Sequence, residues 1–269
     1  MQNPFFQSRE AAFFNQRLKF YPTSDGGYKL AEICTFSDSV FNPDSFERAD
    51  FWGDERKKQP RDTSEKENEC SLSALNRAKK AAFDYMACNP ECNMFVTLTL
   101  DEHKISRTEW GEIVPRLNTW LDNAVRRRGL KYILVPEFHA DGKSIHFHGL
   151  MNEKALSLVN SGKKHRGKVV YNIQNWKFGF TTAKRIGRGE DEHIKVCKYV
   201  FKYMTKAAQE LKNGAKKSVK IGGRYYLHGG ALASPRFEYR NADYGTEKGV
   251  ADFETEISDF LRCCVRTFI

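Results

Sequence analysis

The order of hydrophobic and polar residues predicts two helices and a strand in the first part of a main domain. Over residues 71–86, hydrophobic side chains recur every three or four positions, as on a helix with one buried face. Residues 94–100 alternate instead, which is typical of a strand. Residues 106–128 return to the helical period, with a capping-box sequence at Ser106 and three arginines before Gly129.

More strands and another helix follow in the same part of the chain. Residues 131–137 and 144–151 are strand-like, and the Asp-Gly pair between them favours a hairpin turn. Residues 168–174 and 176–182 extend the series of strands, and residues 197–206 have helical periodicity. Hairpin connections combined with helices predict an α+β fold, an antiparallel central sheet with helices packed mainly on one face.

Two further segments flank this main domain, which we place at residues 71–210. Residues 1–70 hold a hairpin candidate, RLKFY and YKLAEICTF around a Pro-Thr-Ser-Asp-Gly-Gly turn, followed by a charged linker at 54–69. Residues 211–269 are expected to form a basic hairpin and a C-terminal helix packed on the main domain.

The positive charge of the chain is concentrated in one window. The net charge is +10, yet Lys163 to Arg224 alone hold 17 Lys and Arg against four acids. Such a one-sided distribution indicates a polyanionic partner, most often nucleic acid, although a highly charged soluble surface would look similar. Aromatic residues are interleaved with this charge, where they would stack bases or belong to the core: Trp176, Phe178, Phe180, Tyr225 and Tyr226.

Other classes of protein receive little support. We find no long apolar run and no secretory signal, so we expect no membrane partner and a cytoplasmic location. Seven cysteines at uneven spacing do not indicate a disulfide framework. Cys88 and Cys92 have the spacing of half a zinc site, but no second pair follows at finger spacing, and core packing is the competing interpretation.

A histidine pair is the first candidate for chemistry. On the strand SIHFHGLM, His146 and His148 point to the same face. A hairpin would bring Glu137 of the preceding strand towards them, giving a His-His-Glu set suited to Mg²⁺ or Mn²⁺ when phosphate oxygens supply further ligands. His139 is a rival third ligand, and two histidines on a half-exposed face are the simpler interpretation.

A repeat of tyrosine and lysine is the second candidate. In CKYVFKYMTK, Tyr199 and Tyr203 are one helical turn apart and share a face with lysines, about opposite the apolar arc of the same helix. A solvated amphipathic helix would show the same pattern. Lysines near a phenol also favour its ionised form and attract phosphate, which suits a tyrosine nucleophile.

The order of these motifs carries a resemblance to a known family. FVTLTL, then IHFHGL, then YVFKYMTK resembles the motif series of the HUH endonucleases, specifically the two-tyrosine rolling-circle replication initiators of small single-stranded DNA phages and related plasmids. The resemblance covers about residues 71–206. It implies catalytic roles for Tyr199, Tyr203, Lys202 and Lys206, and metal binding by His146, His148 and Glu137.

The resemblance also implies partners and an activity. We expect a metal-dependent nickase and strand transferase that acts on single-stranded DNA at a replication origin in a bacterial host cell. No phosphate-binding helicase loop is found, so a host helicase and polymerase are expected partners. The basic residues predicted to hold the DNA backbone are Lys163, Lys164, Arg166, Lys168, Lys195 and Lys198.

Two alternatives to this function stay open. A non-catalytic module that binds single-stranded nucleic acid would explain the charge and the aromatic residues, but it needs neither the histidine pair nor the tyrosine spacing. A conjugative relaxase or single-strand transposase would use the same chemistry, although relaxases usually place the tyrosine before the histidines and the transposases carry one tyrosine.

Overall fold

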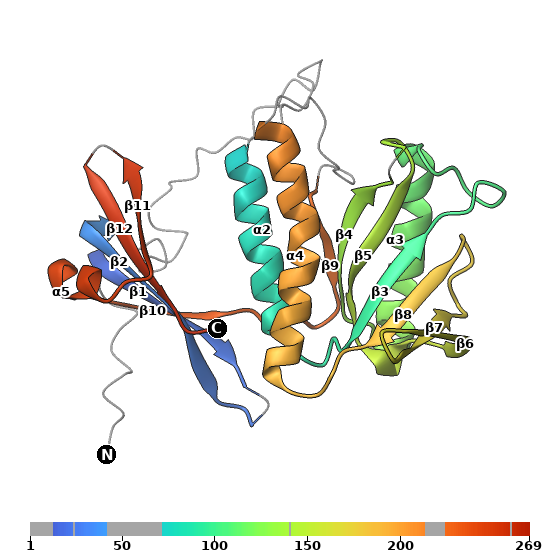
Figure 1. The fold of residues 1–269 in the computed structure, drawn as a ribbon, viewed down its shortest axis with the longest axis horizontal. Coiled ribbons are helices and arrows are strands. Elements are labelled where there is room, and N and C mark those ends of the chain that lie inside the picture. Colours follow the sequence, from blue (N-terminus) through green and yellow to red (C-terminus); the bar gives the residue numbers. More distant parts are fainter. Residues whose placement is uncertain (1–12, 24, 42–71, 140, 213–223, 259) are drawn as a thin grey trace, which may run out of the picture. The chain divides into compact units, whose positions relative to one another are not determined.

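The computed structural model describes residues 13–23, 25–41, 72–139, 141–212, 224–258 and 260–269. Side chains are described over the same ranges except at 41, 72, 73 and 205–212. Contacts within the chain separate it into two units (Figure 1). Unit 1 combines residues 1–67 with 234–269, and unit 2 is the continuous stretch 68–233.

Unit 2 is built on a seven-stranded sheet in which every recorded strand pair is antiparallel. The strands lie in the order β6-β7-β8-β3-β5-β4-β9. Their bounds are β3 (Met94–Thr99), β4 (Tyr132–Phe138), β5 (Ile145–Met151), β6 (Leu158–His165), β7 (Lys168–Ile173), β8 (Thr181–Arg185) and β9 (Leu227–Gly229). The alternation of apolar residues in β3 and β5 places side chains on both faces of this sheet, and both faces are covered.

Helices cover the two faces of the sheet unequally (Figure 1). One face carries α2 (Leu72–Ala87) and α4 (Glu190–Lys212), whose side chains join a core with Phe95, Ile133 and Leu150. The other face carries α3 (Trp110–Arg128), which packs on β3, β4 and β5. A short 3-10 helix, η1 (Glu153–Ala155), follows β5. The predicted α+β class is confirmed, with two of the three long helices on one face.

Two of the predicted boundaries in unit 2 differ from the structure. The helix expected from Ser106 begins at Trp110, because the Ser106 hydroxyl accepts a hydrogen bond from the Glu109 backbone N–H (3.0 Å) and holds a turn before the helix. The strand expected at 176–182 begins only at Thr181. Trp176 instead enters the core, where its indole N–H donates to the Thr99 carbonyl (3.2 Å).

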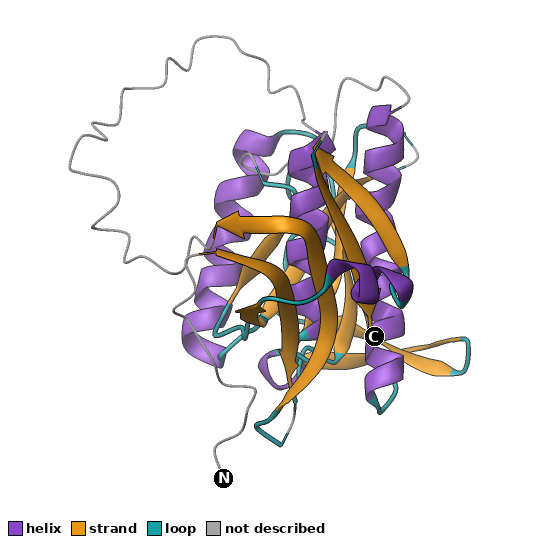
Figure 2. Cartoon of the chain, turned by 90° about the vertical axis from the view of Figure 1, so that its left-hand side faces the viewer, coloured by secondary structure: helices purple, strands orange, loops and turns teal. Residues whose placement is uncertain are grey.

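Unit 1 joins the two ends of the chain in one five-stranded sheet, which Figure 2 shows as strongly curved strands. The predicted N-terminal hairpin is formed by β1 (Phe13–Pro22) and β2 (Tyr28–Phe41). The strands lie in the order β10-β1-β2-β12-β11, with β10 (Arg236–Arg240), β11 (Phe253–Ser258) and β12 (Leu261–Thr267).

The C-terminal segment differs from the expected helix packed on the main domain. Within it only α5 (Tyr244–Gly249) is helical among the described residues, and β10 and β12 pair with β1 and β2. The reason is that the N-terminal hairpin has two open edges, and the C-terminal strands supply the missing hydrogen-bond partners. The basic hairpin expected before this segment falls mostly on residues 213–223, outside the described residues.

Candidate metal and nucleophile site

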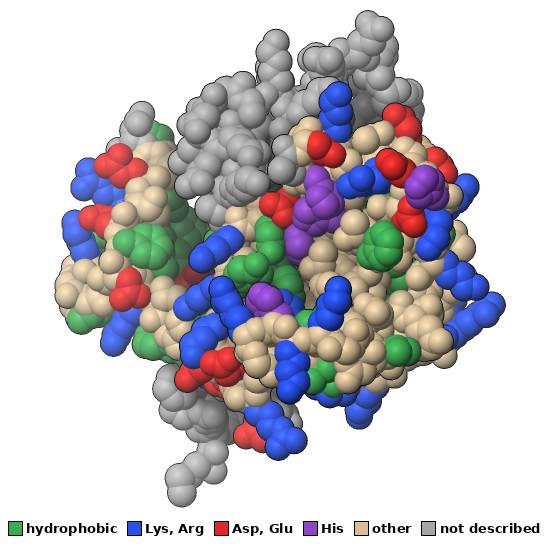
Figure 3. Space-filling view, turned by 45° about the vertical axis from the view of Figure 1, so that its right-hand side comes forward, with side chains coloured by type: hydrophobic (Ala, Val, Ile, Leu, Met, Phe, Trp, Pro, Cys, Tyr) green, Lys and Arg blue, Asp and Glu red, His purple; other side chains and the backbone are tan. Residues whose placement is uncertain are grey.

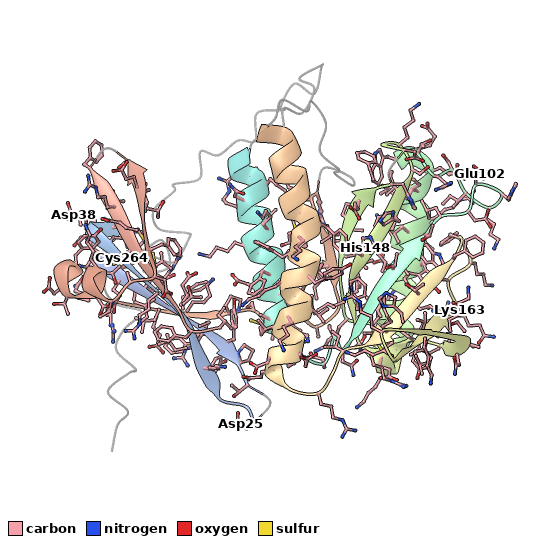
Figure 4. All side chains as sticks on the ribbon, in the orientation of Figure 1. Asp25, Asp38, Glu102, His148, Lys163 and Cys264 are labelled. Atoms are coloured by element: carbon pink, nitrogen blue, oxygen red, sulfur yellow. The ribbon has the colours of Figure 1, made fainter. Side chains whose placement is uncertain are left out.

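Three polar side chains converge on the α2 and α4 face of the unit 2 sheet. Glu137 on β4 lies directly opposite His146 on β5, and Val135 lies opposite His148. The hairpin therefore places both imidazoles beside one carboxylate. The Glu137 Oε2 atom is 3.0 Å from His146 Nε2 and 3.1 Å from His148 Nε2. Figure 4 labels His148 beside these two strands.

The surroundings of the cluster favour an ionised carboxylate and a neutral buried imidazole. Burial alone would raise the pKa of Glu137, but hydrogen bonds with His146 and His148 outweigh burial and hold that pKa below its ordinary value. Burial lowers the pKa of His148, which is almost fully enclosed, although the hydrogen bond with Glu137 opposes this. An anionic oxygen beside uncharged ring nitrogens is a set of electron-pair donors.

This donor set fits a divalent cation. The three ligand atoms all lie within 4.8 Å of one another, and among the described residues they form the one group of three or more His, Cys, Asp or Glu side chains that does so. Two imidazoles and one carboxylate suit Mn²⁺ or Mg²⁺ when oxygen ligands complete the coordination. His139 stands edge-on to His146, with ring centroids 4.1 Å apart, but it does not belong to the group.

The half zinc site considered from the sequence has a different environment. Cys88 and Cys92 are buried, and Cys92 belongs to the core between the sheet and the helices α2 and α4. Burial raises the pKa of Cys92 to about 12, so its thiol is held in the neutral form. A neutral buried thiol in an apolar core behaves as a small hydrophobic side chain.

A threonine that sequence reasoning overlooked orients one of the histidines. Thr97 on β3 is paired with His148 on β5, and its Oγ1 atom lies 3.0 Å from His148 Nδ1. A hydroxyl can donate to this nitrogen or accept from it, so the contact holds the ring in either tautomer. With Nδ1 engaged by Thr97, Nε2 faces Glu137, which is the arrangement that second contacts impose on metal-binding histidines.

The two tyrosines of α4 meet this cluster from the helix side. The Tyr203 ring stacks on His148, with centroids 4.1 Å apart and planes inclined by 8°. Its hydroxyl donates to the Tyr199 oxygen at 2.9 Å. The sequence placed both phenols on a face away from the core, and this is wrong for Tyr203, which is partly buried against the sheet. Because α4 lies flat on the sheet, the edge of its apolar face also makes contacts.

The environments of the two phenols differ. Tyr199 is 48% exposed, whereas burial, the hydrogen bond to Tyr199 and the nearby negative charges raise the pKa of Tyr203. Phe95 on β3 packs edge-on against Tyr199, with centroids 5.5 Å apart, and Lys184 on β8 lies 5.4 Å above the Phe95 ring. Neither Phe95 nor Lys184 was singled out from the sequence, because alternation alone does not separate them from core and surface residues.

The predicted lysines are placed less closely. Lys202 is exposed on α4, and the side chain of Lys206 lies outside the described residues. Lys195 and Lys198 are also exposed on α4, and Lys195 pairs with Glu192 at 2.8 Å. On the face drawn in Figure 3, histidine side chains reach the surface and Lys and Arg side chains are numerous beside them. The remaining predicted DNA contacts, all exposed on the β6–β7 hairpin, are Lys163, Lys164, Arg166 and Lys168.

The interleaved aromatic residues divide between core and surface. Trp176 is buried and Phe178 is packed against the same core, as their competing interpretation held. Tyr225 and Tyr226 are packed partly against the core beneath α2 and α4. Phe180 alone among the five is strongly exposed, at 70%.

Comparison with known proteins gives one match. Residues 93–208 match the model of a family of replication-associated proteins, the ORF2 type. This span runs from the residue before β3 into α4, so it contains the histidine pair, Glu137 and both tyrosines. No curated protein and no solved structure matches the chain. The match supports a role in replication and an interaction with DNA. None of the described helices is long and apolar enough to cross a membrane.

Proposed function

We propose that the protein initiates rolling-circle replication by nicking single-stranded DNA at a specific site and rejoining it through a phosphotyrosine. The observation that carries this proposal is the stacking of Tyr203 on His148, which brings a pair of hydrogen-bonded phenols to a cluster of potential metal ligands. Similarity of residues 93–208 to replication-associated proteins supports the same conclusion.

The chain supplies the nucleophile in this reaction. The phenolic oxygen of Tyr199 or Tyr203 attacks the phosphorus, the bond from phosphorus to the 3′-oxygen breaks, and that oxygen takes up a proton to leave as a 3′-hydroxyl. The 5′-phosphate stays on the tyrosine. When one phenol is deprotonated, the other can donate a hydrogen bond to it across the 2.9 Å contact.

The remaining residues bind and orient the reacting groups. His146, His148 and Glu137 would hold a Mg²⁺ or Mn²⁺ ion, which when bound would polarise the scissile phosphate. Thr97 orients His148. After a round of synthesis the second tyrosine cleaves the regenerated site, and the new 3′-hydroxyl attacks the first phosphotyrosine to close a circle. A host helicase would open the duplex and a host polymerase would extend the 3′-end.

The nucleophiles can be tested with a pool of labelled single-stranded oligonucleotides that carry a randomised centre. Incubation with Mn²⁺ should give a covalent adduct that survives denaturing electrophoresis. Tyr199→Phe/Tyr203→Phe should abolish it, and Tyr171→Phe, which changes a tyrosine on β7, should not. An adduct from the double variant would disprove the assignment. Binding without any adduct, unaffected by a chelator, would indicate a non-catalytic module.

The metal ligands need a separate measurement. Titration calorimetry with Mn²⁺ alone should show one site that is lost in His146→Ala/His148→Ala and weakened in Glu137→Gln. His103→Ala, an exposed histidine outside the cluster, is the matched control. Full Mn²⁺ affinity in the double histidine variant would exclude this site.

A further inference from the structure

The β6–β7 hairpin at one edge of the unit 2 sheet has a tight turn and an exposed end. Its two turn residues, Arg166 and Gly167, both have positive φ (49° and 76°), as in the two-residue turns that suit a twisted ribbon. Arg166 is the one non-glycine residue with positive φ among the described residues. All six residues from 163 to 168 are exposed, and Figure 2 shows a two-stranded ribbon that projects at the lower right.

The end of this ribbon is basic on both faces. In the ladder, Lys164 lies opposite Val169, and His165 lies opposite Lys168. Adjacent positions of a strand point to opposite faces, so Lys164 and Lys168 are on different faces and Arg166 is at the tip. Residues 158–173 include no Asp or Glu. The acid recorded near Lys168 is Glu192 of α4, whose pKa is lowered mainly by its hydrogen bond with Lys195.

The base of the ribbon is fixed to the rest of unit 2. Arg128, in the last turn of α3, donates to the Ser157 hydroxyl (2.6 Å) directly before β6. The Ser161 hydroxyl donates to the Val170 carbonyl across the ladder at 2.7 Å. Arg126 and Arg127 are exposed beside Arg128, so further positive charge lies at the base. A charged element held in this way keeps its cations at a defined spacing.

We propose that the β6–β7 ribbon enters the major groove of double-stranded DNA next to the nicked strand. This groove, about 12 Å wide, admits a two-stranded ribbon, and phosphates line both of its walls. A ribbon with a lysine on each face can contact both walls, whereas a single strand offers one line of phosphates to one face. The inference rests on the proposed function, because it adds a duplex contact to a protein that cleaves a single strand.

The test compares three nucleic acids of one sequence: a DNA duplex of about 20 base pairs, roughly two helical turns, its single strand and the matching RNA duplex. Fluorescence anisotropy would give Kd over a series of salt concentrations for wild type, Lys164→Ala, Lys168→Ala and the double variant. The control is Lys154→Ala/Lys177→Ala, which removes two exposed lysines of unit 2 outside the ribbon. Circular dichroism melting would check that each variant is folded.

We expect each ribbon variant to weaken duplex DNA binding severalfold and to reduce the salt slope by about 0.9, the value for one lost phosphate contact. The double variant should show both losses. Single-strand affinity should fall less, and the RNA duplex should bind more weakly because its major groove is deep and narrow. Unchanged duplex affinity, equal losses on duplex and single strand, or equal binding of RNA and DNA duplexes would overturn the proposal.

Failure of this inference can be separated from failure of the proposed function. The adduct assay with wild-type protein and single-stranded oligonucleotides measures the chemistry without a duplex. An adduct combined with equal losses on duplex and single strand would overturn the ribbon proposal and leave the nickase intact. Selective duplex losses without any adduct would do the reverse.

Discussion

The two units each bury polar side chains in an antiparallel sheet, but the partners of those side chains differ. In unit 1, the Gln16 amide donates to the Thr35 hydroxyl (2.9 Å) and accepts from the Arg240 guanidinium, and Lys19 pairs with Glu32 at 3.7 Å. Each donor there meets an acceptor. In unit 2, the acceptor atoms of Glu137, His146 and His148 point at one another.

The difference separates structural from chemical use of buried polarity. A donor paired with an acceptor is satisfied and stabilises one conformation. Several electron-pair donors that converge repel one another unless a proton or a cation lies between them. The unit 2 cluster is therefore a candidate binding site, whereas the unit 1 network needs no further ligand. The same distinction appears in the sequence only as residue types, without the partners.

The largest expected effect tests the strand that carries the histidines. A Cβ atom at Gly149 would lie 1.9 Å from the Ile133 carbonyl oxygen. Gly149→Ala should therefore force β4 and β5 apart and reduce the free energy of unfolding by about 3 kcal/mol or more. Mn²⁺ binding should be lost as well, because both strands carry ligands. Urea unfolding and Mn²⁺ titration measure the two effects.

The control for this change is Gly111→Ala in α3. A Cβ atom there has open space, and alanine favours a helix over glycine by about 1 kcal/mol. We expect this variant to be as stable as wild type or slightly more so. Wild-type stability and Mn²⁺ affinity in Gly149→Ala would contradict the close approach of the two strands.

The second prediction removes core volume from unit 1. Leu18 on β1 is buried, so Leu18→Ala should reduce the stability of unit 1 by about 3 kcal/mol. Mn²⁺ affinity should stay at the wild-type value, because no ligand of the cluster comes from unit 1. Calorimetry should resolve a shifted transition for unit 1. A matching loss of Mn²⁺ affinity would show that the two units are coupled.

The third prediction concerns the residue that orients His148. Thr97→Val removes the hydroxyl 3.0 Å from His148 Nδ1 while preserving the shape of the side chain. Loss of such a second contact reduces metal affinity about tenfold. Thr182→Val changes the exposed threonine paired with Thr97 on β8 and should leave Mn²⁺ affinity unchanged. Equal Mn²⁺ affinity in Thr97→Val and wild type would show that this contact does not position the ring.

The smallest expected effect is at the surface, where the two units should behave alike. In unit 2 the Arg185 Nε atom donates to both oxygens of Glu153, at 2.8 and 3.0 Å, and in unit 1 Lys248 pairs with Glu254 at 3.0 Å. Solvent screens both pairs, so Glu153→Gln and Glu254→Gln should each change the free energy of unfolding by less than about 1 kcal/mol. A larger loss in either variant would contradict the equivalence.

The pH dependence of this small effect has a defined sign. The hydrogen bond from Arg185 holds the pKa of Glu153 below its ordinary value of 4.5. The stabilisation is therefore complete above pH 4.5 and is lost as the pH falls through the lower pKa of the folded state. Urea unfolding of wild type and Glu153→Gln should differ at about pH 7 and converge near about pH 3. A difference that grows at low pH would contradict this sign.

Local patterns in the sequence were sufficient for the elements of unit 2 and for part of its site. Alternation on adjacent strands and the Asp-Gly turn placed Glu137 beside the histidine pair, because a tight turn determines which residues face each other. The four-residue spacing likewise put Tyr199 and Tyr203 on one side of a helix. These relations lie within one hairpin or one helix, where the backbone geometry is regular.

Only the tertiary structure decided which of these surfaces meet. Nothing in the sequence indicated that Tyr203 would stack on His148, that Thr97 would hold the same ring, or that the ends of the chain would share a sheet. The C-terminal strands β10 and β12 pair with strands from the opposite end of the chain, so no periodic pattern links the partners. The sequence by itself determined local periodicity and the residue types capable of chemistry. Their meeting depended on packing between distant elements, which only the folded chain establishes.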